Sequence, residues 1–439
     1  MVERSLFIKK ISGAQALVII FICTSLFTKF NLPFHFFFIF ILIFSFICLL
    51  FQLKKRNGLK ISSRIEFWHY LLIFYLISIF IFNKLVDFNY DFFPHFWNGQ
   101  SVLVLISVLM ADIVVLKTSS NDILKTLRFL KYISYIMILE SFFSIIIPNN
   151  FNIFVSDFEA GYRFTSILTP GYVYTGLFLI LGYTSFLHLN SSASKRRIFL
   201  IFLCFCFALI QTKDRTSILT FMILNAFVLY KSANSRSITM SIFKKTSFFL
   251  KVILMFAVLY FSLMNFGDRK NFMSLTSSLD RYVIFVRGLN VTEAVLPIGG
   301  GPGSQSRLMT YSKIPFNQSL TSANIEDKNE LTNIERDLNY SKNYMRKKIG
   351  SNKTLSPHNT YLDFTISLGL VGILIVIFIL YIQLRSLGSL LVNQISQKYF
   401  LNAMFVSIFI IFIYTSFITS IWIFLIYYRA TQIYDSQNK

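Results

Sequence analysis

The sequence predicts an all-α, polytopic integral membrane protein with about twelve membrane-spanning helices. Hydrophobic residues make up 55% of the 439 residues and charged residues 14%, whereas a soluble domain carries about 25% charged residues. Apolar runs of about 20 residues, the length that crosses a bilayer, recur along the chain. The 42 basic residues are scattered between these runs. The net charge of +22 therefore indicates membrane topology, not a nucleic-acid-binding face.

The predicted spans follow directly from these runs. They are residues 14–28, 32–53, 65–83, 100–116, 129–147, 171–189, 198–211, 216–230, 247–265 and 360–384. The last apolar stretch, 400–428, would be about 43 Å long as one helix, which exceeds the hydrocarbon core. We therefore divide it near Thr415–Ser420 into two short spans. This division gives twelve helices, and without it there would be eleven.

Basic residues in the connecting loops predict the orientation of the spans. One alternating set of loops holds 24 basic residues, and the short loops of the other set hold five. The positive-inside rule then places both termini in the cytoplasm. The remaining 13 lie in one long outer loop, which the rule exempts. The predicted units are a bundle of helices 1–9 (residues 1–265), this loop (266–357) and a bundle of helices 10–12 (358–439).

The long outer loop has three predicted parts. Residues 268–296 mix apolar and charged positions, which indicates an amphipathic helix on the membrane surface. Residues 298–304, with the sequence Ile-Gly-Gly-Gly-Pro-Gly-Ser, predict a turn, because glycine freely adopts backbone angles that other residues avoid. Residues 317–353 are polar and rich in Asn, Lys and Glu, which predicts a mobile segment.

A histidine stands just before the run that starts near residue 360. It belongs to Ser356-Pro357-His358-Asn359, in which serine suits an N-cap and proline the first helical turn. We therefore expect His358 in that first turn at the outer membrane face, where the helix dipole favours neutral imidazole and bound anions. Such a histidine could act as a general base. The alternative is an interfacial polar residue above packing glycines.

The same run carries small residues at helical spacing. Steps of four, three, four and three residues place five positions on one predicted stripe: His358, Leu362, Thr365, Gly369 and Gly372. The small residues would let another helix approach closely beneath the histidine.

Four arginines fall in predicted outer segments. They are Arg163, in Gly161-Tyr162-Arg163-Phe164; Arg215, in the turn Thr212-Lys213-Asp214-Arg215-Thr216; and Arg281 and Arg287 on the amphipathic segment. The planar guanidinium fork suits phosphate oxygens, so an outer pocket with several arginines would fit a lipid-linked diphosphate. The alternatives are a local Asp214–Arg215 pair, snorkelling at the interface and a solvated helix face.

Acidic residues offer a competing site. Asp87 and Asp91 lie in the first sizeable outer loop, where they are either catalytic acids or solvated loop residues. Asp112 and Glu140 fall inside predicted spans, where a proton-coupled transporter would use them. Buried structural partners would explain them equally well.

The histidine motif resembles the signature of the bacterial O-antigen ligase and O-antigen polymerase superfamily. Pro357-His358-Asn359-Thr360-Tyr361-Leu362 is followed by Gly369-Leu370-Val371-Gly372, which agrees with the family's His-Asn pair and later Gly-x-x-Gly. Arg163-Phe164 looks like the family's arginine motif in an outer loop, and Arg215 lies in a turn similar to its Ser-Arg-Thr turn, with Asp214 in place of serine. Arg281 looks like the arginine upstream of the family's glycine-rich loop.

The resemblance implies a metal-independent, inverting membrane glycosyltransferase without a cofactor, in the bacterial inner membrane with its active site facing the periplasm. Its donor would be a glycan on undecaprenyl diphosphate. Arg163, Arg215 and Arg281, with Arg287, would hold the diphosphate, and His358 would activate the acceptor hydroxyl, so that His358, Arg215 and Arg163 form the catalytic set. Asn359, Tyr361, Gly369 and Gly372 would support the site.

The family's polymerases and ligases share this machinery and differ in acceptor: a second lipid-linked repeat unit, or lipid A–core. The Phe, Ile, Asn and Lys bias is typical of A/T-rich gene clusters that carry polymerases, so we favour an O-antigen polymerase. Expected partners are the lipid-linked donor and acceptor, membrane lipids, a chain-length regulator and a flippase. The rival from another class is a lipid-linked oligosaccharide flippase that uses Asp112 and Glu140.

Overall fold

The computed structural model describes most of the predicted helices. The described residues are 12–29, 35–56, 64–85, 99–147, 153–156, 163–190, 194–234, 275–300, 309, 359–392, 398–414 and 421–437. The helices are α1 (Gly13–Lys29), α2 (His35–Arg56), α3 (Arg64–Leu85), α4 (Gly99–Leu116), α5 (Ser120–Ile146), α6 (Tyr172–Leu189), α7 (Lys195–Thr212), α8 (Arg215–Asn234), α10 (Leu275–Val295), α13 (Thr360–Leu368), α14 (Leu370–Val392), α15 (Tyr399–Ser407), α16 (Phe409–Tyr414) and α17 (Ile421–Gln437). One short hairpin joins β1 (Val155–Ser156) to β2 (Arg163–Phe164).

The helical fold agrees with the apolar pattern of the sequence. Eight predicted spans, from residues 14–28 to 216–230, correspond to α1–α8, whereas the predicted span at 247–265 lies outside the described residues. Within the part of the chain that the structure describes, three helices are long and apolar enough to cross a membrane: α5, α6 and α14. Several shorter apolar helices accompany them. The twelve-span topology stays a prediction.

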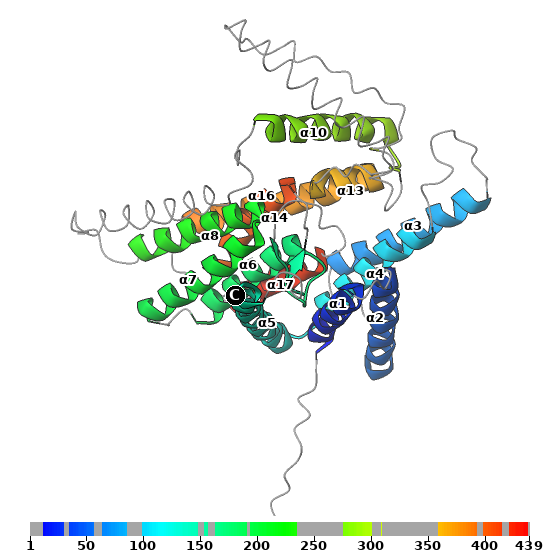
Figure 1. The fold of residues 1–439 in the computed structure, drawn as a ribbon. Helices are drawn as coiled ribbons and strands as arrows, with labels where there is room; N and C mark the ends of the chain where they lie inside the picture. Colours follow the sequence, from blue (N-terminus) through cyan, green and yellow to red (C-terminus); the bar gives the residue numbers. More distant parts are fainter. Residues whose placement is uncertain are drawn as a thin grey trace, which may run out of the picture.

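The core is centred on α6. Every residue from Thr175 to His188 is buried, and α6 packs against α5, α7, α8 and α15 (Figure 1). Two buried tyrosine hydroxyls within this core have hydrogen-bond partners. The Tyr183 hydroxyl donates to Asn225 Oδ1 of α8 (2.7 Å), and the Tyr427 hydroxyl of α17 donates to the Leu181 carbonyl (2.8 Å). These bonds satisfy buried polar groups that would otherwise destabilise the bundle.

The run at 360–384 is not one helix, which corrects the single span that the hydropathy predicts. Gly369 adopts φ 58° and ends α13, and α14 starts at Leu370 and packs back against α13. A Cβ on Gly372 would overlap the Phe364 carbonyl, so the glycine permits the tight elbow between the two helices. The predicted stripe through Thr365, Gly369 and Gly372 is therefore wrong, because hydropathy does not register a positive φ.

The last apolar stretch contains three described helices, α15, α16 and α17. α16 ends at Tyr414 and α17 begins at Ile421, and the predicted division near residues 415–420 lies outside the described residues. A break at Ile408 separates α15 from α16.

The amphipathic segment of the long loop forms α10, which confirms a helix within the predicted range 268–296. α10 packs on α13, and Figure 1 shows it above α13 and α14. Gly288 faces Leu362, because a Cβ there would lie 2.7 Å from Leu362 Cδ1. Thr292 Oγ1 lies 3.2 Å from Thr365 Oγ1. Since residue numbers rise together in both pairs, α10 and α13 run parallel.

Candidate active site

Arg163 is held in a buried position just before α6. It pairs with Ser156 in the β1–β2 hairpin, and its exposed fraction is 9%. The guanidinium lies over the Tyr172 ring, 4.4 Å from the ring centroid, which is cation–π geometry. Its Nε has no hydrogen-bond partner among the described residues. A buried guanidinium with an unused donor is suited to an anionic ligand.

The segment after Arg163 is fastened to the first turn of α6. The Ser166 backbone N–H donates to Thr175 Oγ1 (3.1 Å), and Thr169 Oγ1 lies 2.6 Å from the same hydroxyl. These bonds hold the hairpin in a fixed position relative to α6. They therefore help to place the Arg163 guanidinium over the Tyr172 ring.

Arg215 begins α8 after a tight turn in which Lys213 takes left-handed backbone angles, with φ 51°. Asp214 caps α8 from a buried position. Its carboxylate accepts hydrogen bonds from Thr216 Oγ1 (2.8 Å), from Ser217 N (3.2 Å) and from Ser217 Oγ. Burial raises the pKa of the Asp214 carboxyl, and these hydrogen bonds oppose the rise. The carboxylate is therefore used within the turn, and its bonds hold the backbone of Arg215 in place.

The two arginine segments meet on one face of α6. A Cβ on Gly176 would overlap Ser217 and approach Asp214, so the α7–α8 turn packs directly against this glycine. Tyr172, whose ring lies under the Arg163 guanidinium, precedes Gly176 by four residues and hence lies on the same face of α6. The structure thus brings the segments of Arg163 and Arg215 to adjacent turns of α6.

α16 connects this face to the start of α13. The Tyr399 hydroxyl of α15 donates to the Phe227 carbonyl near the far end of α8 (2.9 Å), and α16, ten residues on, also packs against α8. The Tyr361 ring lies 6.0 Å from the Phe409 ring and 5.9 Å from the Phe412 ring, measured between centroids. The first turn of α13 therefore lies beside α16.

Asn359 and Tyr361 have clear structural partners. Asn359 Oδ1 accepts from the Leu362 backbone N–H (3.0 Å), so Asn359 is the N-cap of α13. The Tyr361 hydroxyl donates to Gln383 Oε1 of α14 (3.0 Å). The predicted cap, Ser356, and His358 lie outside the described residues. α13 starts at Thr360, so its N-cap is Asn359 and not the predicted Ser356.

Arg287 is buried on α10, with an exposed fraction of 3%, and its Nε donates to the Met309 carbonyl. Burial lowers its pKa to about 10, so it keeps its charge at neutral pH. Arg287 adjoins Gly288 and therefore lies at the level of Leu362 in α13. Arg281 lies six residues before Arg287 in α10, nearer the N-terminal end of that helix.

The glycine-rich turn binds the elbow between α13 and α14. The Gly300 backbone N–H donates to the Ile366 carbonyl (2.8 Å), and the Leu370 N–H donates to the Pro297 carbonyl (2.9 Å). Gly299 adopts φ 87°, and a Cβ there would overlap the Gly369 backbone. Both glycines are thus needed for a backbone-to-backbone contact, which differs from the helix–helix contact that the sequence predicts.

α13 has a buried polar face that was not among the sequence-based predictions. Thr360, Asp363 and Ser367 follow steps of three and four residues, and all three are buried. Asp363 Oδ2 and Ser367 Oγ have no hydrogen-bond partner among the described residues. The sequence feature that could have indicated this face is Asp363, an acidic residue in an apolar run five residues after His358. Such unsatisfied buried groups mark α13 as a candidate ligand-binding helix.

The competing acids have separate surroundings. Asp112 Oδ2 lies 3.2 Å from His69 Nε2, which joins α4 to α3, and Glu140 is buried on α5. Asp87 and Asp91 lie outside the described residues. Within the described ranges, no group of three or more His, Cys, Asp or Glu side chains is arranged to hold a metal ion.

The cap at Asn359 allows a stability test. We expect Asn359→Ala to lower the free energy of unfolding by about 1 kcal/mol, because the Leu362 N–H loses its acceptor. Asn359→Asp keeps an acceptor and should restore most of the loss. Thermal unfolding of the purified protein in detergent measures both effects, and an alanine variant as stable as the wild type would contradict the assignment of the cap.

Comparison with known proteins agrees with the motif resemblance. Residues 199–377 match the family model described as O-antigen ligase. The matched segment contains the Arg215 turn, α10, α13 and the first part of α14, whereas Arg163 precedes it. No curated protein and no solved structure matches the chain significantly. The match and the apolar helices support an integral membrane protein of the bacterial inner membrane, in O-antigen and lipopolysaccharide biosynthesis. The match over residues 199–377 therefore supports the resemblance of this chain to the superfamily of O-antigen ligases and O-antigen polymerases.

Proposed function

We propose that this protein is an O-antigen polymerase that joins lipid-linked oligosaccharide repeat units at the periplasmic face of the inner membrane. The observation that carries the proposal is the meeting of the Arg163 and Arg215 segments on one face of α6. Guanidinium groups suit the diphosphate of an undecaprenyl-linked donor, because a planar fork binds phosphate oxygens in pairs. The family match supports an enzyme of the ligase and polymerase type.

The proposed reaction is an inverting glycosyl transfer. The acceptor hydroxyl oxygen bonds to the anomeric carbon of the donor while the bond from that carbon to the diphosphate oxygen breaks. The diphosphate leaves with the bonding electron pair, and Arg163 and Arg215 stabilise its charge, with Arg281 and Arg287 as further contacts. The hydroxyl proton passes to His358, which acts as general base without a metal ion.

The proposed supporting roles follow from contacts on α13. Asn359 fixes the helix start directly after His358 in the chain, and Tyr361 joins α13 to α14. Asp363 is a further candidate, because its buried Oδ2 has no partner among the described residues. It could accept a hydrogen bond from a sugar hydroxyl.

The second candidate function is an O-antigen ligase, which the description of the matched family favours. Polymerase and ligase differ in the acceptor only, so gene deletion followed by surface glycan analysis separates them. A lipid A–core that carries one repeat unit indicates a polymerase. Long chains that remain on the lipid carrier, with none on the core, indicate a ligase.

Complementation of the deletion strain separates an enzyme from a transporter. We expect His358→Ala and Arg215→Ala to abolish glycan extension while the protein still inserts into the membrane. Asp112→Ala is expected to retain extension, because Asp112 pairs with His69 and not with the arginine segments. Full extension by both of the first two variants, with loss only in Asp112→Ala, would favour the flippase and exclude this site. Immunoblots of membrane fractions control for expression.

A further inference from the structure

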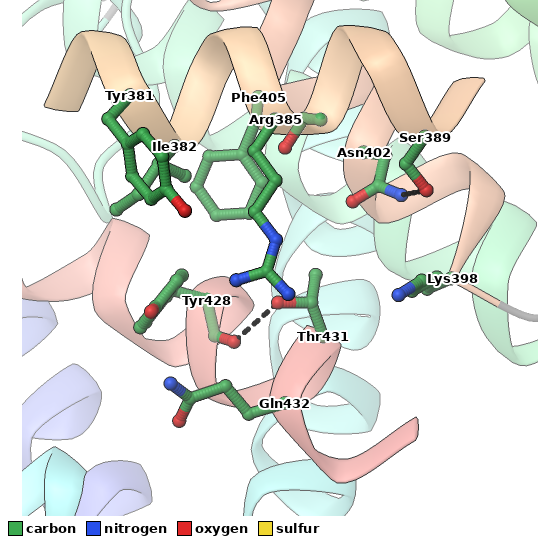
Figure 2. Close-up of a pocket in the computed structure, with 11 residues that line it drawn as sticks. Tyr381, Ile382, Arg385, Ser389, Lys398, Asn402, Phe405, Tyr428, Thr431 and Gln432 are labelled. Carbon is green, nitrogen blue, oxygen red and sulfur yellow. Dashed lines mark hydrogen bonds between the residues drawn. The ribbon is translucent and has the colours of Figure 1, made fainter. Parts of the chain in front are cut away.

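A cavity of about 340 Å³ lies between the last turns of α14, the start of α15 and the C-terminal half of α17. Figure 2 shows its lining side chains. Arg385 and Lys398 supply two cationic groups, and no carboxylate is among the residues that line the cavity. The remaining polar lining consists of hydroxyl and amide groups. A cavity of this charge and chemistry selects an anion with several hydrogen-bond acceptors.

The two cations enter the cavity from different elements. The Arg385 guanidinium extends from α14 toward Thr431 and Gln432 of α17, and the Lys398 amine points into the same space from the residue before α15 (Figure 2). Asn402 Nδ2 donates to Ser389 Oγ (3.0 Å), which joins α15 to α14 beside the cations. A phosphate group between the two cations would accept hydrogen bonds from the planar guanidinium of Arg385 and from the ammonium group of Lys398.

An exposed apolar stripe on α14 leads to this cavity. Leu374, Ile377, Tyr381 and Leu384 follow steps of three, four and three residues, and each is more than half exposed. Tyr381 is part of both the stripe and the cavity lining. Only 17% of the apolar window of α14 is buried within the protein, so most of this helix is available to lipid. A polar cavity continuous with an apolar stripe fits an amphiphile better than a free anion.

The cavity lies close to the contact between α13 and α14. The Tyr361 hydroxyl of α13 donates to Gln383 Oε1 of α14, and Arg385 follows Gln383 by two residues. Arg385 and Lys398 belong to the basic set that the positive-inside rule assigns to the cytoplasmic side. Neither residue is among those proposed to hold the diphosphate.

We propose that this cavity binds the headgroup of an anionic phospholipid. Its phosphodiester lies between Arg385 and Lys398, and its acyl chains follow the Leu374–Leu384 stripe. Basic pockets between membrane helices on the cytoplasmic side are suited to such headgroups. None of the residues that line the cavity has a role in the proposed glycosyl transfer, so the lipid assay below tests the cavity alone.

The test uses the purified full chain in nanodiscs of phosphatidylcholine with increasing phosphatidylglycerol. Native mass spectrometry counts retained phosphatidylglycerol, and thermal unfolding reports the stabilisation that a bound ligand produces. The variant is R385Q/K398Q. The matched control is R196Q/R197Q, which removes two exposed cations at the start of α7, outside the cavity. A third sample replaces phosphatidylglycerol with inorganic phosphate.

We expect R385Q/K398Q to bind phosphatidylglycerol roughly 30-fold more weakly, because each cation near the membrane contributes about 1 kcal/mol. The control variant should match the wild type, and inorganic phosphate should not stabilise the protein. Equal retention by R385Q/K398Q and wild type would overturn the proposal. So would equal retention of phosphatidylcholine, or stabilisation by inorganic phosphate alone. Should the double variant fail to fold, R385Q serves alone, because Arg385 is exposed.

Discussion

Replacing Arg163 with alanine is expected to reduce glycan extension by roughly 100- to 1,000-fold, the usual cost of removing one group that stabilises developing charge. The guanidinium is buried over Tyr172 and has a donor that no described group accepts. Its loss removes a charge from the proposed diphosphate site and leaves the α6 face in place. Complementation of the deletion strain, with surface glycans resolved by length, measures the effect.

Two further variants show whether geometry or charge matters at this position. Arg163→Lys keeps a positive charge but loses the planar fork, so extension should recover only in part. Arg196→Ala removes an exposed arginine at the start of α7 and should leave extension unchanged. Normal extension by Arg163→Ala at wild-type protein levels would rule out the role of Arg163 in the proposed site.

Replacing Gly369 with alanine is expected to destabilise the fold by about 2 to 4 kcal/mol, which combines left-handed backbone strain with an overlap that no rotamer relieves. The new Cβ would overlap the Pro297 carbonyl and approach the Gly299 backbone. The glycine-rich turn would then leave the α13–α14 elbow. Folded yield from membranes and thermal unfolding in detergent measure this loss.

Gly388→Ala is the matched control for this prediction. Gly388 lies in α14, the helix that begins directly after Gly369. A Cβ on Gly388 would have no heavy atom within 4 Å. An alanine in a helix is more favourable than glycine, so this variant should be as stable as the wild type or more stable. If Gly369→Ala and Gly388→Ala behave alike, the elbow does not depend on the backbone contact described above.

Much of the fold could be predicted because apolar runs of bilayer length have few alternatives. α1 to α8 fall where the hydropathy places them. The elbow at Gly369 could not be predicted this way, since α13 and α14 are both apolar and only a backbone angle separates them. A glycine inside an apolar run is equally compatible with close helix packing, which is the interpretation that failed.

The candidate site was predicted in part. Residue type made Arg163 and Arg215 candidates, because guanidinium groups suit phosphate. Their common neighbour, α6, could not be predicted, because the sequence does not show which turn packs against which helix. A local Asp214–Arg215 pair was one alternative for this turn, and the structure shows that Asp214 caps α8 through Thr216 and Ser217. Asp363 was missed, because one acid in an apolar run does not reveal whether its carboxylate has a partner.

The contact between Gly300 and Ile366 has a consequence for the 58 residues from 301 to 358. Gly300, just before this stretch, is bonded to Ile366, and Asn359, just after it, is the N-cap of the same helix, α13. Ile366 and Asn359 lie about 10 Å apart along the helix. The two ends of the stretch are therefore fastened to one short helix, and closing such a loop costs only about 0.6 kcal/mol more for each doubling of its length. We therefore expect changes of length in this stretch, away from Met309, to cost the fold little.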